Sequence, residues 1–189
     1  MKLTCCNVDQ AVFYQCEGSS IIILDVHVDD CTIAVSSMEL IDEVKMKMGT
    51  CVEVTDLGKL HWLLGIEVVH DRESHMLQLS QQAYIEEIIC HFNFDKLCPV
   101  STPMQTGLNL STAQSPTTAD QIAAMCNIPF HQAISLLMYT SLGTQPNITF
   151  AVSHLSKFLQ NPRMVHWLAA KHIFRYLSGT KDHWLVYGE

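Results

Sequence analysis

Residues 21–35 read Ile-Ile-Ile-Leu-Asp-Val-His-Val-Asp-Asp-Cys-Thr-Ile-Ala-Val, the most informative stretch of this sequence. Its two ends, Ile21–Leu24 and Thr32–Val35, are apolar runs typical of buried strands, and Asp29 and Asp30 lie between them. A strand, a turn with two carboxylates and a returning strand predict a β-hairpin. Acidic pairs are common in such turns, because Asp tolerates turn geometry and is well solvated there. The hairpin alone therefore leaves open both a solvated turn and a cation site.

The cation-site interpretation rests on the chemistry of the two carboxylates. Neighbouring carboxylates repel each other unless a cation or water separates them, and Mg²⁺ prefers hard oxygen ligands of this kind. Asp29 and Asp30 are therefore candidate ligands for Mg²⁺, which Mn²⁺ could replace. Asp25, His27 and Asp29 alternate along one strand and would share a face. This alternation leaves a second metal site open. We favour the alternative, that Asp25 and His27 are chance substitutions without a role as metal ligands.

The composition is that of a folded chain. It has 189 residues, of which 48% are hydrophobic and 16% are charged. These values permit a sizeable core in one domain or two small ones and exclude a disordered acidic tail. No segment reaches the roughly 20 apolar residues of a membrane span, and the N-terminus lacks the apolar core of a signal peptide. We therefore expect no membrane association and a location in the cytoplasm or nucleus, where the eight cysteines are free thiols.

The charge is distributed unevenly along the chain. A net charge of −8 argues against a simple nucleic-acid binder. Residues 1–120 carry 17 acidic and 6 basic side chains, whereas residues 121–189 carry 2 acidic and 5 basic ones. Opposite balances suggest different roles, although scattered charges that only solvate helix faces explain the pattern equally well. Lys171 and Arg175 in the basic part lie one helical turn apart, which predicts a common exposed face.

The spacing of apolar residues predicts strands with two helices in the first half of the chain. A capping box, with Ser36 as N-cap and Glu39 at the third helical position, predicts a helix that ends near Met48. Gly65 interrupts a strand pattern, which indicates a bulge or a close backbone approach. The expected strands cover residues 10–16, 20–28, 31–35, 59–70 and 76–79, and the expected helices cover residues 36–48 and 81–92.

The second half is predicted to be helical after a long irregular stretch. Residues 95–127 contain prolines and a run rich in serine and threonine, which is typical of a linker or loop. Asn161 as N-cap, Pro162 in the first turn and Gly179 beyond the end delimit the last helix. The pattern as a whole predicts an α+β half followed by a helical half. The expected helices cover residues 129–142, 147–160 and 163–177, and a last strand covers residues 184–187.

Several short motifs follow one another along nearly the whole chain. In this order they resemble the C-terminal part of the reverse transcriptase of copia-type LTR retrotransposon polyproteins. Each motif is weak alone, and it is the shared order of six or more that carries the resemblance. The motifs are Asp9-Gln-Ala-Val-Phe13, His27-Val-Asp-Asp30, Asp56-Leu-Gly-Lys-Leu-His-Trp-Leu-Leu-Gly-Ile-Glu67, Leu79-Ser-Gln-Gln-Ala-Tyr84, Pro99-Val-Ser-Thr-Pro-Met104, Leu137-Met-Tyr139, Thr144-Gln-Pro-Asn-Ile148, His166-Trp167 and Arg175-Tyr-Leu-Ser-Gly-Thr180.

The resemblance implies a right-handed polymerase fold, with part of a palm followed by a helical thumb lobe. Residues 1–94 would form the partial palm, an antiparallel sheet with helices that includes the primer-grip hairpin and the helix after it. Residues 95–127 would be the loop or linker. Residues 128–189 would form the thumb and the start of the connection to an absent RNase H domain.

The resemblance also assigns roles to individual residues. Asp29 and Asp30 would be the catalytic palm carboxylates that bind Mg²⁺, and His27, where the family has Tyr, would lie beside the incoming nucleotide. The partners would be an RNA template, a DNA primer, dNTPs and the remaining domains of the polyprotein. The primer grip would consist of Leu63, Leu64 and Gly65, and the nucleic-acid-binding residues of the thumb would be Lys171 and Arg175.

The chain also departs from the family pattern. The fingers and the family's first catalytic aspartate, which lie on earlier segments, are absent from this sequence. Gln145 and His131 stand where the family has arginines, which weakens a phosphate-binding surface. We therefore expect an RNA-directed DNA polymerase (nucleotidyltransferase) fragment that is inactive alone. The alternatives are a non-enzymatic remnant that binds nucleic acid or protein, and an unrelated α+β binding protein.

Overall fold

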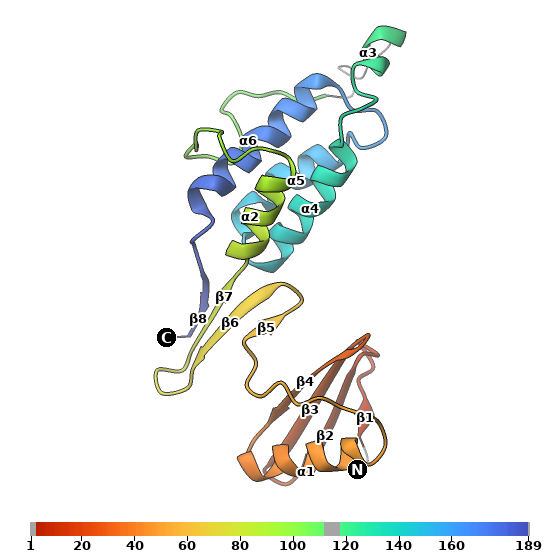
Figure 1. The fold of residues 1–189 in the computed structure, drawn as a ribbon, viewed down its shortest axis with the longest axis vertical. Helices are drawn as coiled ribbons and strands as arrows, with labels where there is room; N and C mark the ends of the chain where they lie inside the picture. Colours follow the sequence, from red (N-terminus) through yellow and green to blue (C-terminus); the bar gives the residue numbers. More distant parts are fainter. Residues whose placement is uncertain (1–2, 112–117, 189) are drawn as a thin grey trace. The chain divides into compact units, whose positions relative to one another are not determined.

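The apolar runs on both sides of the acidic pair form a β-hairpin in the computed structural model, which describes residues 3–111 and 118–188. Its strands pair in antiparallel register, with His27 opposite Asp30 and Leu24 opposite Ile33. Together with the two preceding strands, they form an antiparallel sheet in the order β1-β2-β3-β4 (Figure 1). The strands are β1 (Thr4–Cys5), β2 (Val12–Glu17), β3 (Ser20–His27) and β4 (Asp30–Val35).

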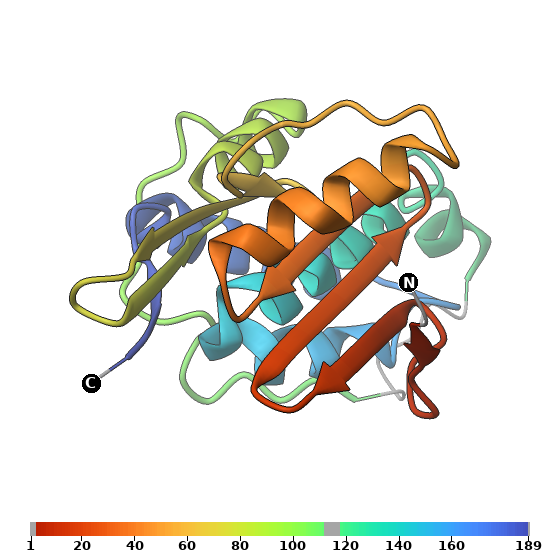
Figure 2. The same cartoon turned by 90° about the horizontal axis from the view of Figure 1, so that it is seen from below.

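A helix covers one face of this first sheet. It is α1 (Met38–Gly49), which lies along the sheet in Figure 2. Alternate strand residues point to opposite faces, so Ile22 and Leu24 are buried beneath the helix, as is Val44 on the helix itself. The side chains of Ile21 and Ile23 point to the other face and are 45% and 42% exposed. This sheet and helix belong to the first of two compact units, residues 1–60.

The predicted capping box at Ser36 is wrong. The helix begins at Met38, and its N-cap is Ser37, whose side chain makes no capping hydrogen bond. The Ser36 hydroxyl instead accepts a hydrogen bond of 3.0 Å from the backbone N–H of Ile21, 15 residues away. A tertiary contact at the sheet therefore replaces the local cap that the sequence pattern predicted.

The second unit, residues 61–189, contains its own antiparallel sheet in the order β5-β6-β7-β8. The strand expected over residues 59–70 is a hairpin that reverses at Leu64 and Gly65, both of which have a positive φ. Two such residues in a two-residue loop form a type I′ turn, which matches the twist of paired strands. The strands are β5 (Trp62–Leu63), β6 (Ile66–Asp71), β7 (Met76–Ser80) and β8 (Leu185–Tyr187).

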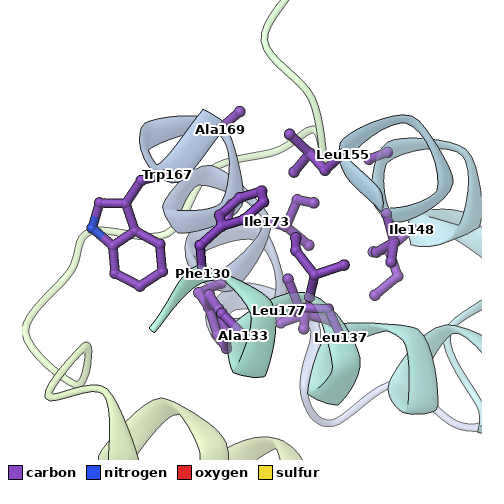
Figure 3. Packing of buried hydrophobic residues seen from close by; sticks show 14 of the residues in the cluster. Phe130, Ala133, Leu137, Ile148, Leu155, Trp167, Ala169, Ile173 and Leu177 are labelled. Carbon is purple, nitrogen blue, oxygen red and sulfur yellow. The ribbon is translucent and has the colours of Figure 1, made fainter. Parts of the chain in front are cut away.

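Helices of the second unit share one hydrophobic core, part of which Figure 3 shows. The helix after β7 forms as predicted, and its apolar side is buried, including Ile85, Ile88 and Ile89. It joins the core of the later helices, so residues 82–91 pack in the second unit. The helices are α2 (Gln82–His91), α4 (Phe130–Gly143), the 3₁₀ helix η2 (Pro146–Ile148), α5 (Thr149–Ser156) and α6 (Met164–Thr180).

The segment expected as a linker at 95–127 packs against this core over much of its described length. Leu110 and Met125 are buried, and the segment contains a short helix, α3 (Ala119–Ala123). Most of the serine- and threonine-rich run, residues 112–117, lies outside the described residues. The segment packs in this way, and is not a free linker, because apolar side chains are spaced between its prolines. Burying them against the helices stabilises a fixed path for an irregular backbone.

The predicted boundaries of the last helix are also wrong. α6 begins at Met164 after Arg163, whose backbone N–H donates to Nδ1 of His166 at 2.9 Å. Arg163 is therefore the N-cap in place of Asn161, and His166, at the third helical position, accepts the reciprocal bond of a capping box. At the other end Gly179 lies inside the helix, where a Cβ would approach Pro99 to 3.0 Å. The glycine permits close packing there and does not end the helix.

The protein thus combines α and β structure with two antiparallel sheets, in agreement with the predicted α+β class. All eight cysteines lie in the described parts of the chain and are free, as expected. Among the residues that the structure describes, none of the helices has the length and apolar character needed to cross a membrane.

We expect acid to destabilise the second unit through His166. Its side chain is fully buried against the ring of Phe158, and its Nε2 has no hydrogen-bond partner among the described residues. Burial lowers the pKa of His166, and the charges of Arg163 and His154 add to this effect. The folded state therefore binds fewer protons than the unfolded state, so stability is present above the ordinary pKa of 6.5 and is lost as the pH falls below it.

The measurement is the urea midpoint at pH 7.5 and pH 5.5. We expect His166→Gln, which cannot take up a proton, to show a smaller fall between these pH values than the wild type. The exposed His183 gives a matched control, and His183→Gln should retain the wild-type fall. Equal falls in the wild type and His166→Gln would contradict the prediction.

Candidate functional site

The acidic pair lies at the tip of the first hairpin, as predicted. Asp29 is the second residue of the two-residue turn after β3, and Asp30 is the first residue of β4. Both side chains are exposed, as is that of His27 across the ladder from Asp30. The tip therefore presents two carboxylates and an imidazole to solvent, within three residues of one another along the backbone.

The turn that carries the pair has an unusual backbone. Val28 has a φ of 55° and is 84% exposed. A β-branched residue in this left-handed region is disfavoured, because its Cβ approaches the backbone too closely. Strained residues of this kind concentrate at functional sites, where the surrounding structure holds them in place. The strain at Val28 thus agrees with a functional role of this turn.

The hairpin tip by itself offers few metal ligands. Within the described residues, no group of three or more His, Cys, Asp or Glu side chains is arranged to hold a metal ion. Asp25 is half-buried within the strand, where it pairs with Val12 and Thr32. An ion at Asp29 and Asp30 would therefore need water or groups from another molecule to complete its coordination.

The second candidate element is the hairpin of β5 and β6. Its turn residue Leu64 is 44% exposed, Gly65 is also exposed, and Leu63 before them is half-buried. Trp62 at the start of the hairpin is 54% exposed. The tip therefore presents backbone and apolar side chains to solvent, in a form that can lie against another molecule.

A residue that the sequence analysis did not assign, Tyr139, contacts this turn. Its hydroxyl donates a hydrogen bond to the backbone carbonyl of Leu64, 75 residues earlier. The only signal in the sequence is that Tyr139 ends one of the ordered motifs, Leu137-Met-Tyr139. That motif gives no indication of the partner, because the contact joins two distant segments.

The two cations on α6 share a face, but the prediction that this face is exposed is wrong. Lys171 and Arg175 are half-buried, and both line one cavity of about 380 Å³ with residues 97–108. The Lys171 ammonium lies 5.3 Å from the centre of the Phe94 ring, and Nε of Arg175 donates to the carbonyl of Cys98 at 2.8 Å. The segment that was expected to be a free loop thus covers part of the basic face.

The other basic side chains of the second half add little to a continuous charged surface. Lys181 forms an ion pair of 2.7 Å with Glu86, and this hydrogen bond lowers the pKa of Glu86. Lys157 is exposed at the end of α5. Lys181 is therefore engaged by a carboxylate, whereas Lys157 stays exposed to solvent.

Comparison with known proteins gives consistent matches along the chain. A family model described as reverse transcriptase (RNA-dependent DNA polymerase) matches residues 2–106. The Retrovirus-related Pol polyprotein from transposon TNT 1-94 of Nicotiana tabacum is 38% identical over 176 residues, which are 93% of this chain. The Retrovirus-related Pol polyprotein from transposon RE1 of Arabidopsis thaliana is 32% identical over 175 residues, also 93% of the chain.

These relatives are much longer than the chain, which spans 13% of the first polyprotein and 11% of the second. A shorter relative, an uncharacterized mitochondrial protein of Arabidopsis thaliana, is 30% identical over 161 residues, and the match covers 62% of its length. No solved structure matches the chain. Both the acidic hairpin and the β5–β6 hairpin lie within the residues matched by the family model.

Proposed function

The chain belongs to the reverse transcriptase family, in the form carried by copia-type retrotransposon polyproteins, and from this premise we propose its function. Residues 1–94 act as part of a polymerase palm, and residues 128–189 act as the thumb. The chain holds a catalytic metal ion and the end of a primer during RNA-directed DNA synthesis. Its ligands are an RNA template, a DNA primer and dNTPs.

The exposed acidic tip of the first hairpin is the observation that carries this proposal. Asp29 and Asp30 present hard oxygen ligands at one end of the first sheet, and α1 covers one face of that sheet. This donor set fits Mg²⁺, which binds through one or two carboxylates and keeps several waters. The bound ions would stabilise the attacking and leaving oxygens of nucleotidyl transfer. The role of this chain in the reaction is to hold the two carboxylates in place at the end of a strand.

The same geometry supports a role for the neighbouring imidazole. His27 is the last residue of β3 and pairs with Asp30, so its position in the ladder is fixed next to the acidic pair. Its exposed side chain can contact a nucleotide bound there. We assign it to that neighbourhood and not to the metal, because Asp29 and Asp30 already supply the anionic oxygens that a hard cation prefers.

The β5–β6 hairpin is the proposed contact for the primer end. Leu63, Leu64 and Gly65 form a tip with little charge, which can lie against the sugar face of a terminal nucleotide without repelling its phosphate. Lys171 and Arg175 would add cations toward the duplex backbone. Their contribution is limited, because Arg175 already donates to Cys98 and Lys171 lies against an aromatic ring.

The isolated chain is proposed to be inactive. Two carboxylates from one turn hold one ion loosely, whereas in-line transfer needs two fixed ions. The remaining ligands would come from other domains of the polyprotein. If the ligands are shared between this chain and other domains, the chain can keep a metal-binding turn and a primer-binding turn without completing a reaction.

The test is a titration of the full chain with Mn²⁺, in which the free ion is followed by electron paramagnetic resonance. We expect weak binding that decreases at least about tenfold in the double variant Asp29→Asn and Asp30→Asn, because a neutral amide lacks the charge that attracts the cation. The control is Asp42→Asn, which removes an exposed charge from α1 of the same unit. Unchanged affinity in the double variant would exclude the metal site.

A further inference from the structure

The turn of the β5–β6 hairpin has a backbone that its own residues do not favour. Leu64 has a φ of 51° and Gly65 a φ of 75°. Turns of this type usually place Asn, Asp or Gly at both positions, because only these residues adopt the left-handed region readily. Leucine at the first position is therefore strained. Some contact from outside the hairpin has to favour this conformation over the alternatives.

Tyr139 on α4 supplies such a contact. Its hydroxyl donates a hydrogen bond to the carbonyl oxygen of Leu64, the residue with the disfavoured φ. A Cβ placed on Gly65 would lie 3.9 Å from the same hydroxyl oxygen. The tyrosine hydroxyl thus lies against both residues of the turn. It satisfies a carbonyl that a two-residue loop directs away from the strands.

The ring of Tyr139 is itself held in position. The ring of Tyr84 meets it at 5.0 Å between centroids and an angle of 72°, an edge-to-face arrangement. Tyr84 belongs to α2, which follows β7 directly along the chain. The hydroxyl at the turn is therefore backed by two helices of the hydrophobic core. Side chains packed in this way lose little further freedom when they form a hydrogen bond.

We propose that Tyr139 is a positioning residue, which fixes the Leu64–Gly65 turn in the conformation that receives the primer end. The contact of the turn with the primer end rests on the proposed function. The support of the turn by Tyr139 does not, because it is independent of any ligand. Without the hydroxyl, the turn would sample other conformations and its tip would no longer present one surface. The end of the primer would then be held in several positions, which lowers the chance of in-line attack.

Two measurements on the full chain test the inference in Tyr139→Phe, which keeps the ring and removes the hydroxyl. The first is amide hydrogen exchange over residues 62–67. We expect exchange to become at least five times faster there and to remain unchanged in α4 and α6. The control Tyr84→Phe removes a hydroxyl from the neighbouring ring and should leave exchange at residues 62–67 at the wild-type rate. Unchanged exchange in Tyr139→Phe would overturn the inference.

The second measurement is photocrosslinking to an RNA–DNA hybrid whose primer ends in 4-thiothymidine. In the wild type we expect crosslinks at residues 62–66. In Tyr139→Phe we expect at least a fivefold lower yield at these residues, with hybrid affinity within twofold of the wild type. An unchanged yield would overturn the positioning role. If the wild type gives no crosslink while exchange still increases in Tyr139→Phe, the proposed primer contact fails and the support of the turn stands.

Discussion

Phe174→Ala is expected to lower the free energy of unfolding of the second unit by about 3–5 kcal/mol. Phe174 is 1% exposed, and its ring centre lies 5.2 Å from that of Phe92 and 5.3 Å from that of Phe94. The alanine would leave a cavity at the meeting point of α2, α6 and the segment after α2. Because whole domains are stable by only about 5–15 kcal/mol, this loss would leave a large unfolded fraction.

A urea titration followed by tryptophan fluorescence measures the effect, since Trp167 is buried in the same core. The matched control is Phe150→Ala on α5. Its side chain is 73% exposed, so its truncation should cost less than about 1 kcal/mol. If Phe174→Ala lowered the free energy of unfolding as little as the control is expected to, the ring cluster around Phe174 would not support the fold.

The full chain is expected to give no DNA synthesis on a poly(rA)–oligo(dT) template with Mg²⁺ or Mn²⁺. In the described residues, Asp29 and Asp30 have no third acidic, His or Cys side chain placed with them to hold a metal ion. Two ions have to be fixed for in-line transfer, and the positioning of the reactants supplies a large part of the rate enhancement. Both requirements exceed what one turn can provide.

The measurement is incorporation of labelled dTTP, and Asp29→Asn is the control for background. Incorporation by the wild type that disappears in Asp29→Asn would show this expectation to be wrong. It would mean that Asp25 or a second copy of the chain supplies the missing ligand. No incorporation, together with Mn²⁺ binding that depends on Asp29 and Asp30, would agree with a fragment that needs the other polyprotein domains.

The first hairpin illustrates what could be predicted from sequence alone. Alternating or continuous apolar residues on both sides of a polar turn specify strands through burial of one face, and this preference is local. The placement of Asp29 and Asp30 at an exposed tip follows directly from it. The apolar stripe on α2 was likewise predictable, because a spacing of three and four residues defines one side of a helix.

Helix ends and covered surfaces were not predictable in the same way. Ser36 fits the pattern of a cap, yet its hydroxyl bonds to Ile21. At α6 the N-cap is Arg163, whose backbone N–H donates to His166, a pairing that the sequence pattern does not suggest. Lys171 and Arg175 were correctly placed on one face of a helix, but residues 97–108 cover part of that face. The position of a helix end and the exposure of a helix face depend on which distant segment of the chain packs against them.

The family, the acidic hairpin and the mixed α+β class follow from the sequence alone, because ordered motifs and the periodic burial of apolar residues are encoded in short stretches. The support of the Leu64 turn and the accessibility of the cations on α6 depend instead on tertiary packing. Tyr139 and Leu64 are 75 residues apart, and so their hydrogen bond depends on the packing of a complete helical core. No local pattern encodes that packing, since it arises from the simultaneous burial of side chains contributed by every helix around that core.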